Sequence, residues 1–100
     1  MQGKIIGKAE DHTVYINDRQ ILVKDSLKII NHSPDGFSWG YGGSGPSQLA
    51  LAILLKFVNV DVALKLYQDF KWKFLVNLDT FSDFEISCEQ IEEYIKDNED

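Results

Sequence analysis

The sequence predicts an α+β domain in which a small antiparallel sheet of three to five short strands packs against about three helices. Two observations indicate this class. Short segments with strand character lie mostly before residue 40, whereas helical apolar patterns fill residues 47–78 and the C-terminal end. Because 100 residues is the size of one domain, we expect a single domain over residues 1–100.

Residues 1–39 are the β-rich part. Residues 4–10 have strand character, and in residues 13–17 the apolar Val14 and Ile16 alternate with other side chains, which is a period of two. A turn and two further short strands are then expected at residues 17–20, 21–23 and 27–30. Pro34 and Gly36 mark a turn that closes this part.

Residues 40–46 form a glycine-rich loop, and residues 47–78 hold two helices. Residues 47–57 are apolar on nearly every side, which predicts a helix in the middle of the domain, with Pro46 at its first position. Asn59 and Asp61 offer caps for the second helix. The apolar stripe of that helix consists of Ala63, Leu66, Tyr67, Phe70 and Phe74.

Residues 84–100 are expected to form a short strand and an acidic C-terminal helix, after a loop at 79–83. Ser87 and Gln90 have the spacing of a capping box at the start of that helix. Its inner face consists of Ile91, Tyr94 and Ile95, and we expect it to fray over residues 96–100.

Charge and composition exclude several functions. Residues 89–100 hold six acids and one base, whereas the rest holds ten acids and nine bases, so no basic stripe for duplex DNA exists. The single cysteine, Cys88, excludes an internal disulfide and suits the cytoplasm, and the N-terminus has no secretion signal. The longest apolar run, 49–55, is too short for a membrane span. With two histidines and no paired ligand spacing, neither a metal nor another cofactor is expected.

The stretch GYGGSGPS at residues 40–47 matches G-x-G-x-x-G, the pattern of a loop that holds a dinucleotide pyrophosphate. The named nucleotide folds do not fit. The helix is followed by another helix and not by a parallel strand, and Gly45-Pro46-Ser47 supplies no lysine for a P-loop.

The physics of an anion-binding loop still applies to this stretch. The glycines that would take a positive φ at little cost are Gly42, Gly43 and Gly45. With Ser44 or Gly45 at or near the N-cap, the helix would begin with N–H groups that lack helical partners, namely those of Ser47, Gln48 and Leu49.

The side chains around the loop allow two interpretations. Trp39 and Tyr41 could stack on a base, which contributes about 1–3 kcal/mol per base. Alternatively, both rings belong to the core, and the glycines only let the chain reverse beneath them.

Four other positions, Asn31, His32, Ser33 and Arg19, are candidates for ligand contacts. Asn31 could contact a base edge, and His32 could bind a phosphate, act as a general base with Ser33 or another serine, or hold the loop backbone. Arg19, the one arginine, is either a solvated turn residue or a phosphate clamp.

Residues 31–54 closely resemble a family of domains of unknown function, seen in bacteria, archaea and phages. The shared pattern is N-H-S-P-x-G-F-x-W-G-Y-G-G-S-G-P-x-Q-L-A-L-A-I-L, and the later Leu66–Lys71 also fits. The resemblance implies kinship over nearly the whole chain. Occurrence in phages implies one idea, that the protein sequesters a nucleotide signal of bacterial defence.

The leading hypothesis is therefore a non-catalytic binder of a small phosphorylated ligand, such as a nucleotide or cyclic nucleotide signal. Since one small chain can hardly enclose a dinucleotide, we expect a site shared between subunits of a homo-oligomer. The alternative is a protein-interaction module that uses the glycine-rich segment and the acidic tail. A third hypothesis is a hydrolase or transferase that uses His32 and a serine.

Overall fold

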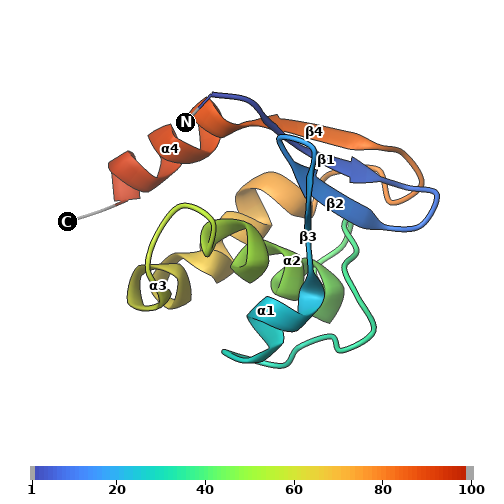
Figure 1. The fold of residues 1–100 in the computed structure, drawn as a ribbon, viewed down its shortest axis with the longest axis horizontal. Helices are drawn as coiled ribbons and strands as arrows, with labels where there is room; N and C mark the ends of the chain where they lie inside the picture. Colours follow the sequence, from blue (N-terminus) through green and yellow to red (C-terminus); the bar gives the residue numbers. More distant parts are fainter. Residues whose placement is uncertain (1, 99–100) are drawn as a thin grey trace.

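Residues 2–98, which the computed structural model describes, form a four-stranded antiparallel sheet with helices beneath one of its faces (Figure 1). The strands are β1 (Lys4–Lys8), β2 (Thr13–Ile16), β3 (Arg19–Ile21) and β4 (Phe84–Ser87), and their order in the sheet is β3-β2-β1-β4. The predicted α+β class is confirmed, with the N-terminal part supplying most of the sheet.

The helices are α1 (Val23–Leu27), α2 (Ser44–Leu54), α3 (Val60–Phe70) and α4 (Cys88–Asn98). A π-helical segment, η1 (Lys71–Leu75), continues α3 directly. Within residues 2–98, no helix combines the length and the apolar character that crossing a membrane requires.

The sheet turns one set of apolar side chains toward the helices. Ile5 pairs with Ile86 of β4 on one side and with Ile16 of β2 on the other. In the next row Gly7 lies opposite Phe84, and a Cβ atom on Gly7 would come within 2.1 Å of the Phe84 ring. The absence of a side chain on Gly7 therefore lets the Phe84 ring lie across β1 and reach the core.

The β2–β3 hairpin is tighter than the predicted turn at residues 17–20. Asn17 and Asp18 both have positive φ, at 47° and 70°, which is the geometry of a two-residue type I′ turn. Arg19 already pairs with Ile16. The expected strand at 21–23 consequently occurs two residues earlier, because the turn needs only two residues.

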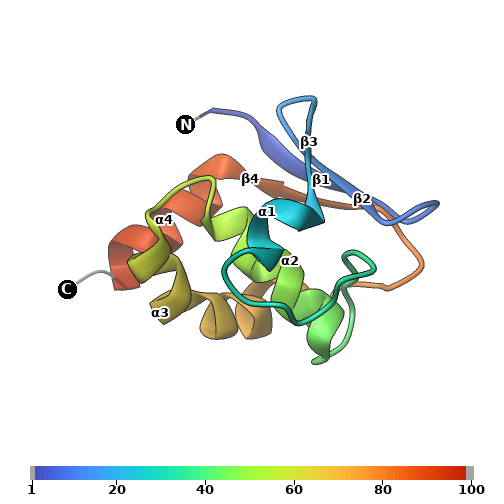
Figure 2. The same ribbon diagram turned by 60° about the horizontal axis from the view of Figure 1, so that its bottom comes forward.

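Helix α2 occupies the centre of the helical layer (Figure 1). Residues 45–54 are all buried, and α2 contacts α1, α3 and η1. The predicted buried helix is confirmed, although it ends at Leu54 and not at residue 57. Figure 2 shows the segment between α1 and α2 running around the outside of α2.

The strand expected at residues 27–30 is wrong, because this segment is the end of α1 and the turn that follows it. The Ser26 hydroxyl donates to Val23 O at 2.9 Å, and Ile29 N–H donates to Ser26 O at 3.0 Å. The Gln48 side-chain amide of α2 donates to both Ser26 Oγ and Ile30 O. This contact from a distant helix fixes a conformation that local β-branching does not indicate.

Of the two caps predicted for α3, Asn59 is confirmed as the N-cap, whereas Asp61 lies in the first turn of the helix and is not a cap. The apolar stripe predicted for α3 is confirmed. The Asn59 side chain accepts a hydrogen bond from Val62 N–H at 3.0 Å. The stripe faces inward, with Phe74 half-buried and the remaining members, Ala63, Leu66, Tyr67 and Phe70, buried.

The capping box of α4 is also confirmed. Gln90 N–H donates to Ser87 Oγ at 3.1 Å, and Ser87 N–H donates to Gln90 Oε1 at 3.0 Å. The inner face of α4, formed by Ile91, Tyr94 and Ile95, is buried. The helix continues to Asn98, so the fraying expected from residue 96 onward does not occur at residues 96–98, and residues 99–100 lie outside the described part of the chain.

Cys88 joins β4 to α4 in the interior. Its N–H donates to Gly3 O at 2.9 Å, and its side chain is fully buried. Burial raises the pKa of the Cys88 thiol. The thiol is therefore a core group in an apolar environment.

Candidate anion-binding site at the start of helix α2

Helix α2 begins two residues earlier than expected. Gly43 is the N-cap, Ser44 is the first helical residue and Pro46 is the third. Ser47 N–H donates to Gly43 O at 3.2 Å, so the predicted free amides at residues 47–49 are already inside the helix. Among the described residues, the N–H groups of Ser44 and Gly45 have no protein acceptor.

No side chain compensates this helix start. Gly43 forms no side-chain cap, and the first turn of α2 contains no acidic residue. Both features leave the positive end of the helix dipole without a negative partner from its own sequence.

The glycines of the loop provide space for neighbouring side chains, and the one with positive φ is not among those for which it was predicted. Gly40 has a φ of 90°, whereas Gly42, Gly43 and Gly45 have no positive φ, contrary to expectation. A Cβ on Gly42 would lie 2.8 Å from the Trp72 ring, and one on Gly43 would lie 2.5 Å from the Tyr41 ring. Two aromatic rings therefore rest on consecutive glycines immediately before α2.

Tyr41 covers one side of the helix start. Its hydroxyl lies 2.6 Å from Ser38 Oγ, and a Cβ on Gly45 would come within 1.8 Å of that same Ser38 oxygen. Gly45 is accordingly buried, while Ser44 is exposed. The open side of the helix start is the side of Ser44.

Trp39 is a core residue and cannot be the base-stacking platform that we expected. Its ring is fully buried, with Phe84 edge-on at a centroid distance of 4.7 Å and His12 at 4.7 Å. The indole N–H donates to the carbonyl oxygens of Asp79 and Ser82. Trp39 thus anchors the loop, and of the two predicted rings only Tyr41 is exposed.

Gln48 and Ser47 also have internal partners. Gln48 is fully buried, and its Oε1 accepts from the N–H groups of His32 and Ser33 at 2.7 and 3.0 Å. The Ser47 hydroxyl donates to Gly43 O at 3.2 Å. These side chains hold the segment before the loop against α2.

The other predicted residues are not gathered at the helix start. His32 Nε2 lies 2.8 Å from the Tyr67 hydroxyl, and Ser33 donates to Gly36 O, so within residues 2–98 no serine hydroxyl is bonded to the His32 ring. Asn31 is exposed beside this segment. Arg19 is exposed in β3, and no described contact joins it to the glycine-rich loop.

Lys71 and Trp72 are residues of this site that the sequence analysis did not predict, and Lys71 is the buried one of the two. Only 6% of its surface is exposed, and its Nζ lies 3.5 Å from Gly42 O, the carbonyl that precedes the N-cap. Nζ also lies 5.0 Å from the centroid of the Trp72 ring. Within residues 2–98 no carboxylate pairs with this ammonium group.

The π-helical segment η1 supplies both Lys71 and Trp72. Val76 N–H bonds to Lys71 O at 3.1 Å, which is the wider i to i+5 spacing. Such turns insert one residue into a helix and occur frequently at functional sites. Here the inserted turn places Lys71 inward beside Gly42 and leaves 57% of the adjacent Trp72 exposed.

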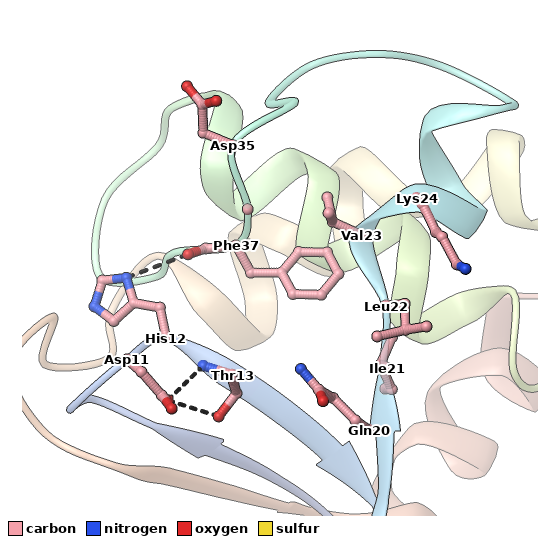
Figure 3. A pocket seen from close by; sticks show the side chains of 11 residues that line it. Asp11, His12, Thr13, Gln20, Ile21, Leu22, Val23, Lys24, Asp35 and Phe37 are labelled. Carbon is pink, nitrogen blue, oxygen red and sulfur yellow. Dashed lines mark hydrogen bonds between the residues drawn. The ribbon is translucent and has the colours of Figure 1, made fainter.

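A separate hollow of about 310 Å³ lies between the β3–α1 junction and residues 35–37 (Figure 3). His12 Nδ1 donates to Phe37 O at 3.2 Å on its wall. The Thr13 hydroxyl and N–H bond to Asp11 and lower the pKa of that carboxyl group. Lys24 and acidic residues both line this hollow, so its charge selects no ligand class. No group of three or more potential metal ligands occurs among the described residues.

The fold and the site define a small α+β domain with a glycine-rich loop that leads into a buried central helix. The chain belongs to the family of unknown function DUF6166, whose model matches residues 3–97. No curated protein and no solved structure matches the chain.

Proposed function

We propose that the protein binds a small phosphorylated ligand, without catalysing a reaction, at the site formed by Gly42, Gly43, Ser44, Lys71 and Trp72. The single observation that supports this proposal most is the buried Lys71 ammonium group, which lies beside an uncapped helix start and has no carboxylate partner in the described chain.

The electrostatics favour an anion. An ammonium group has three N–H donors, and the one acceptor here is Gly42 O at the long distance of 3.5 Å. The N-terminus of α2 adds about half a positive charge within a few residues. Two positive groups so close together are unfavourable when one is shielded from water, and a phosphate oxygen would compensate both.

Isothermal titration with inorganic phosphate, pyrophosphate and a panel of nucleotides tests this proposal. We expect at least one of them to bind to the wild-type protein and Lys71→Met to lose that binding. Lys73→Met is the matched control, because Lys73 is exposed and already pairs with Asp69 at 3.5 Å. No heat with any of these compounds, or equal binding by Lys71→Met, would contradict the proposal.

Nucleotide signals are the ligands that we propose to test first, including cyclic nucleotides. If the protein comes from a phage, as the family resemblance suggested, such a binder would be a sponge for a defence signal in the host cytoplasm. We also propose a homo-oligomer in which two subunits enclose a larger ligand. Sedimentation equilibrium with and without ligand tests this assembly, and a monomer under both conditions would exclude it.

One observation favours a second function, the binding of another protein. Phe81 is 89% exposed, and the exposed Tyr41 and Trp72 add two further aromatic side chains of the kind that anchor protein interfaces. In this case Phe81→Ala would release a co-purifying partner, and Lys71→Met would not.

A further inference from the structure

We infer that the ligand contains a planar aromatic ring, such as a nucleobase, and that this ring stacks on the exposed face of Trp72. This inference rests on the proposed function, and it identifies the chemical class of the ligand and the residue that selects it.

Trp72 is exposed and yet held in place. Its ring packs against Gly42 so closely that a Cβ atom there would lie 2.8 Å from it, and Lys71 Nζ lies 5.0 Å from the ring centroid. More than half of the residue, 57%, remains accessible to solvent. An exposed aromatic ring that is already ordered by its neighbours loses little entropy when another ring stacks on it.

The position of Trp72 beside Lys71 is the second argument. The two residues are adjacent in η1, and the ammonium group lies 5.0 Å from the centroid of the indole ring and 3.5 Å from Gly42 O. A ligand whose phosphate reaches Lys71 therefore has its remaining atoms next to the indole. A mononucleotide has an anionic group and a flat ring in one small molecule, which is the combination that this surface can contact.

The two tryptophans provide a direct measurement. Trp39 is fully buried and Trp72 is exposed, so a ligand that stacks on Trp72 quenches only the solvent-exposed part of the fluorescence. We expect this quenching with the four common 5′-mononucleotides and none with ribose 5-phosphate. Trp72→Phe should keep most of the affinity but lose the quenching signal.

Affinities of variants complete the test. Because stacking contributes about 1–3 kcal/mol per base, Trp72→Leu should bind mononucleotides roughly 5-fold to 150-fold more weakly. The same variant should bind ribose 5-phosphate as the wild-type protein does. Phe81→Leu, which removes another exposed ring, should leave mononucleotide affinity unchanged.

The outcomes separate the two proposals. If ribose 5-phosphate and mononucleotides bind equally well, or if Trp72→Leu binds mononucleotides normally, the stacking inference is wrong while the phosphate site stands. If neither kind of ligand binds to the wild-type protein, the proposed function is wrong and the stacking inference with it.

Discussion

Gln48 is a buried side-chain amide that uses both of its ends. Its Oε1 accepts two backbone N–H groups from residues 32 and 33, and its Nε2 donates to Ser26 Oγ and Ile30 O. One residue of α2 thereby holds the end of α1 and the first residues of the segment that follows it. The polar position in an otherwise apolar helix is a structural requirement.

Replacing Gln48 by leucine should lower the free energy of unfolding by about 3 kcal/mol, because several backbone groups would lose their partners in the interior. Urea denaturation measures this loss. The matched control is Gln68→Leu, since Gln68 is exposed on α3 and makes one long contact with Ser47 at 3.4 Å. A loss for Gln48→Leu no larger than the control would mean that this network is dispensable.

Lys71 should have the opposite effect on stability. Its ammonium group is buried beside a positive helix end and has one weak acceptor, so Lys71→Met should raise the free energy of unfolding of the ligand-free protein by about 1 kcal/mol. Thermal unfolding in low-salt buffer measures the change. A clearly less stable Lys71→Met protein would show that the ammonium group is a structural element and not one reserved for a ligand.

At the level of elements, α2 and α4 both have a serine at the N-terminal end, but only the serine of α4 caps its helix. Ser87 accepts from Gln90 N–H and completes a capping box, whereas Ser44 is the first residue of α2 and caps nothing. Ser87→Ala should therefore cost about 1 kcal/mol of stability, and Ser44→Ala should cost a few tenths at most. Urea denaturation of both variants measures the two losses of unfolding free energy. Equal losses for Ser87→Ala and Ser44→Ala would contradict the difference in capping.

The elements that the sequence predicted are those with local signals. The apolar residues of α2, the stripe of α3 and the Ser87–Gln90 spacing each specify one conformation within a few residues. In contrast, the segment at 27–30 has β-branched residues but is held in a helical turn by Gln48, which lies about twenty residues away in the chain.

The site was less predictable than the fold, for a related reason. The glycine pattern located the start of α2, but the predicted ring Trp39 is enclosed by partners from residues 79–84. Lys71 and Trp72 were not predicted, because a lysine in a regular helix is expected to be exposed and not buried against the glycine-rich loop. The π-helical turn that buries Lys71 has no sequence signature of its own in this chain.

At the scale of the whole molecule, the loop at 79–83 joins distant parts. It accepts the Trp39 indole N–H, while Thr80 donates to Trp39 O and Gly40 N–H bonds to Leu75 O. Sheet, loop and η1 thus meet around one tryptophan. The ordering of the candidate site depends on this junction.

Acid should weaken that junction. Hydrogen bonds from Phe81 N–H and the Ser82 hydroxyl lower the pKa of Asp79 below its ordinary value of 3.8. A lowered pKa in the folded state means that these bonds stabilise the fold above pH 3.8 and are lost as the pH falls through the lower folded value.

Asp79→Asn should therefore lower the melting temperature at neutral pH. Between neutral pH and acid, the melting temperature of this variant should then fall less than that of the wild-type protein. Asp35→Asn, a change of an exposed carboxyl group, is the control. Identical acid profiles for Asp79→Asn and the wild-type protein would contradict this role of Asp79.

The buried thiol of Cys88, at the junction of β4 and α4, can be used to measure how often the folded protein opens locally. An aromatic disulfide reagent should react with Cys88 only after the N-terminal strand and the last helix separate, because the Cys88 side chain is fully buried and its N–H donates to Gly3 O. The rate of colour development in the native protein therefore measures how often these two ends part. If a ligand bound at the start of α2 stabilises the whole domain, adding that ligand should slow the reaction of Cys88 with the reagent.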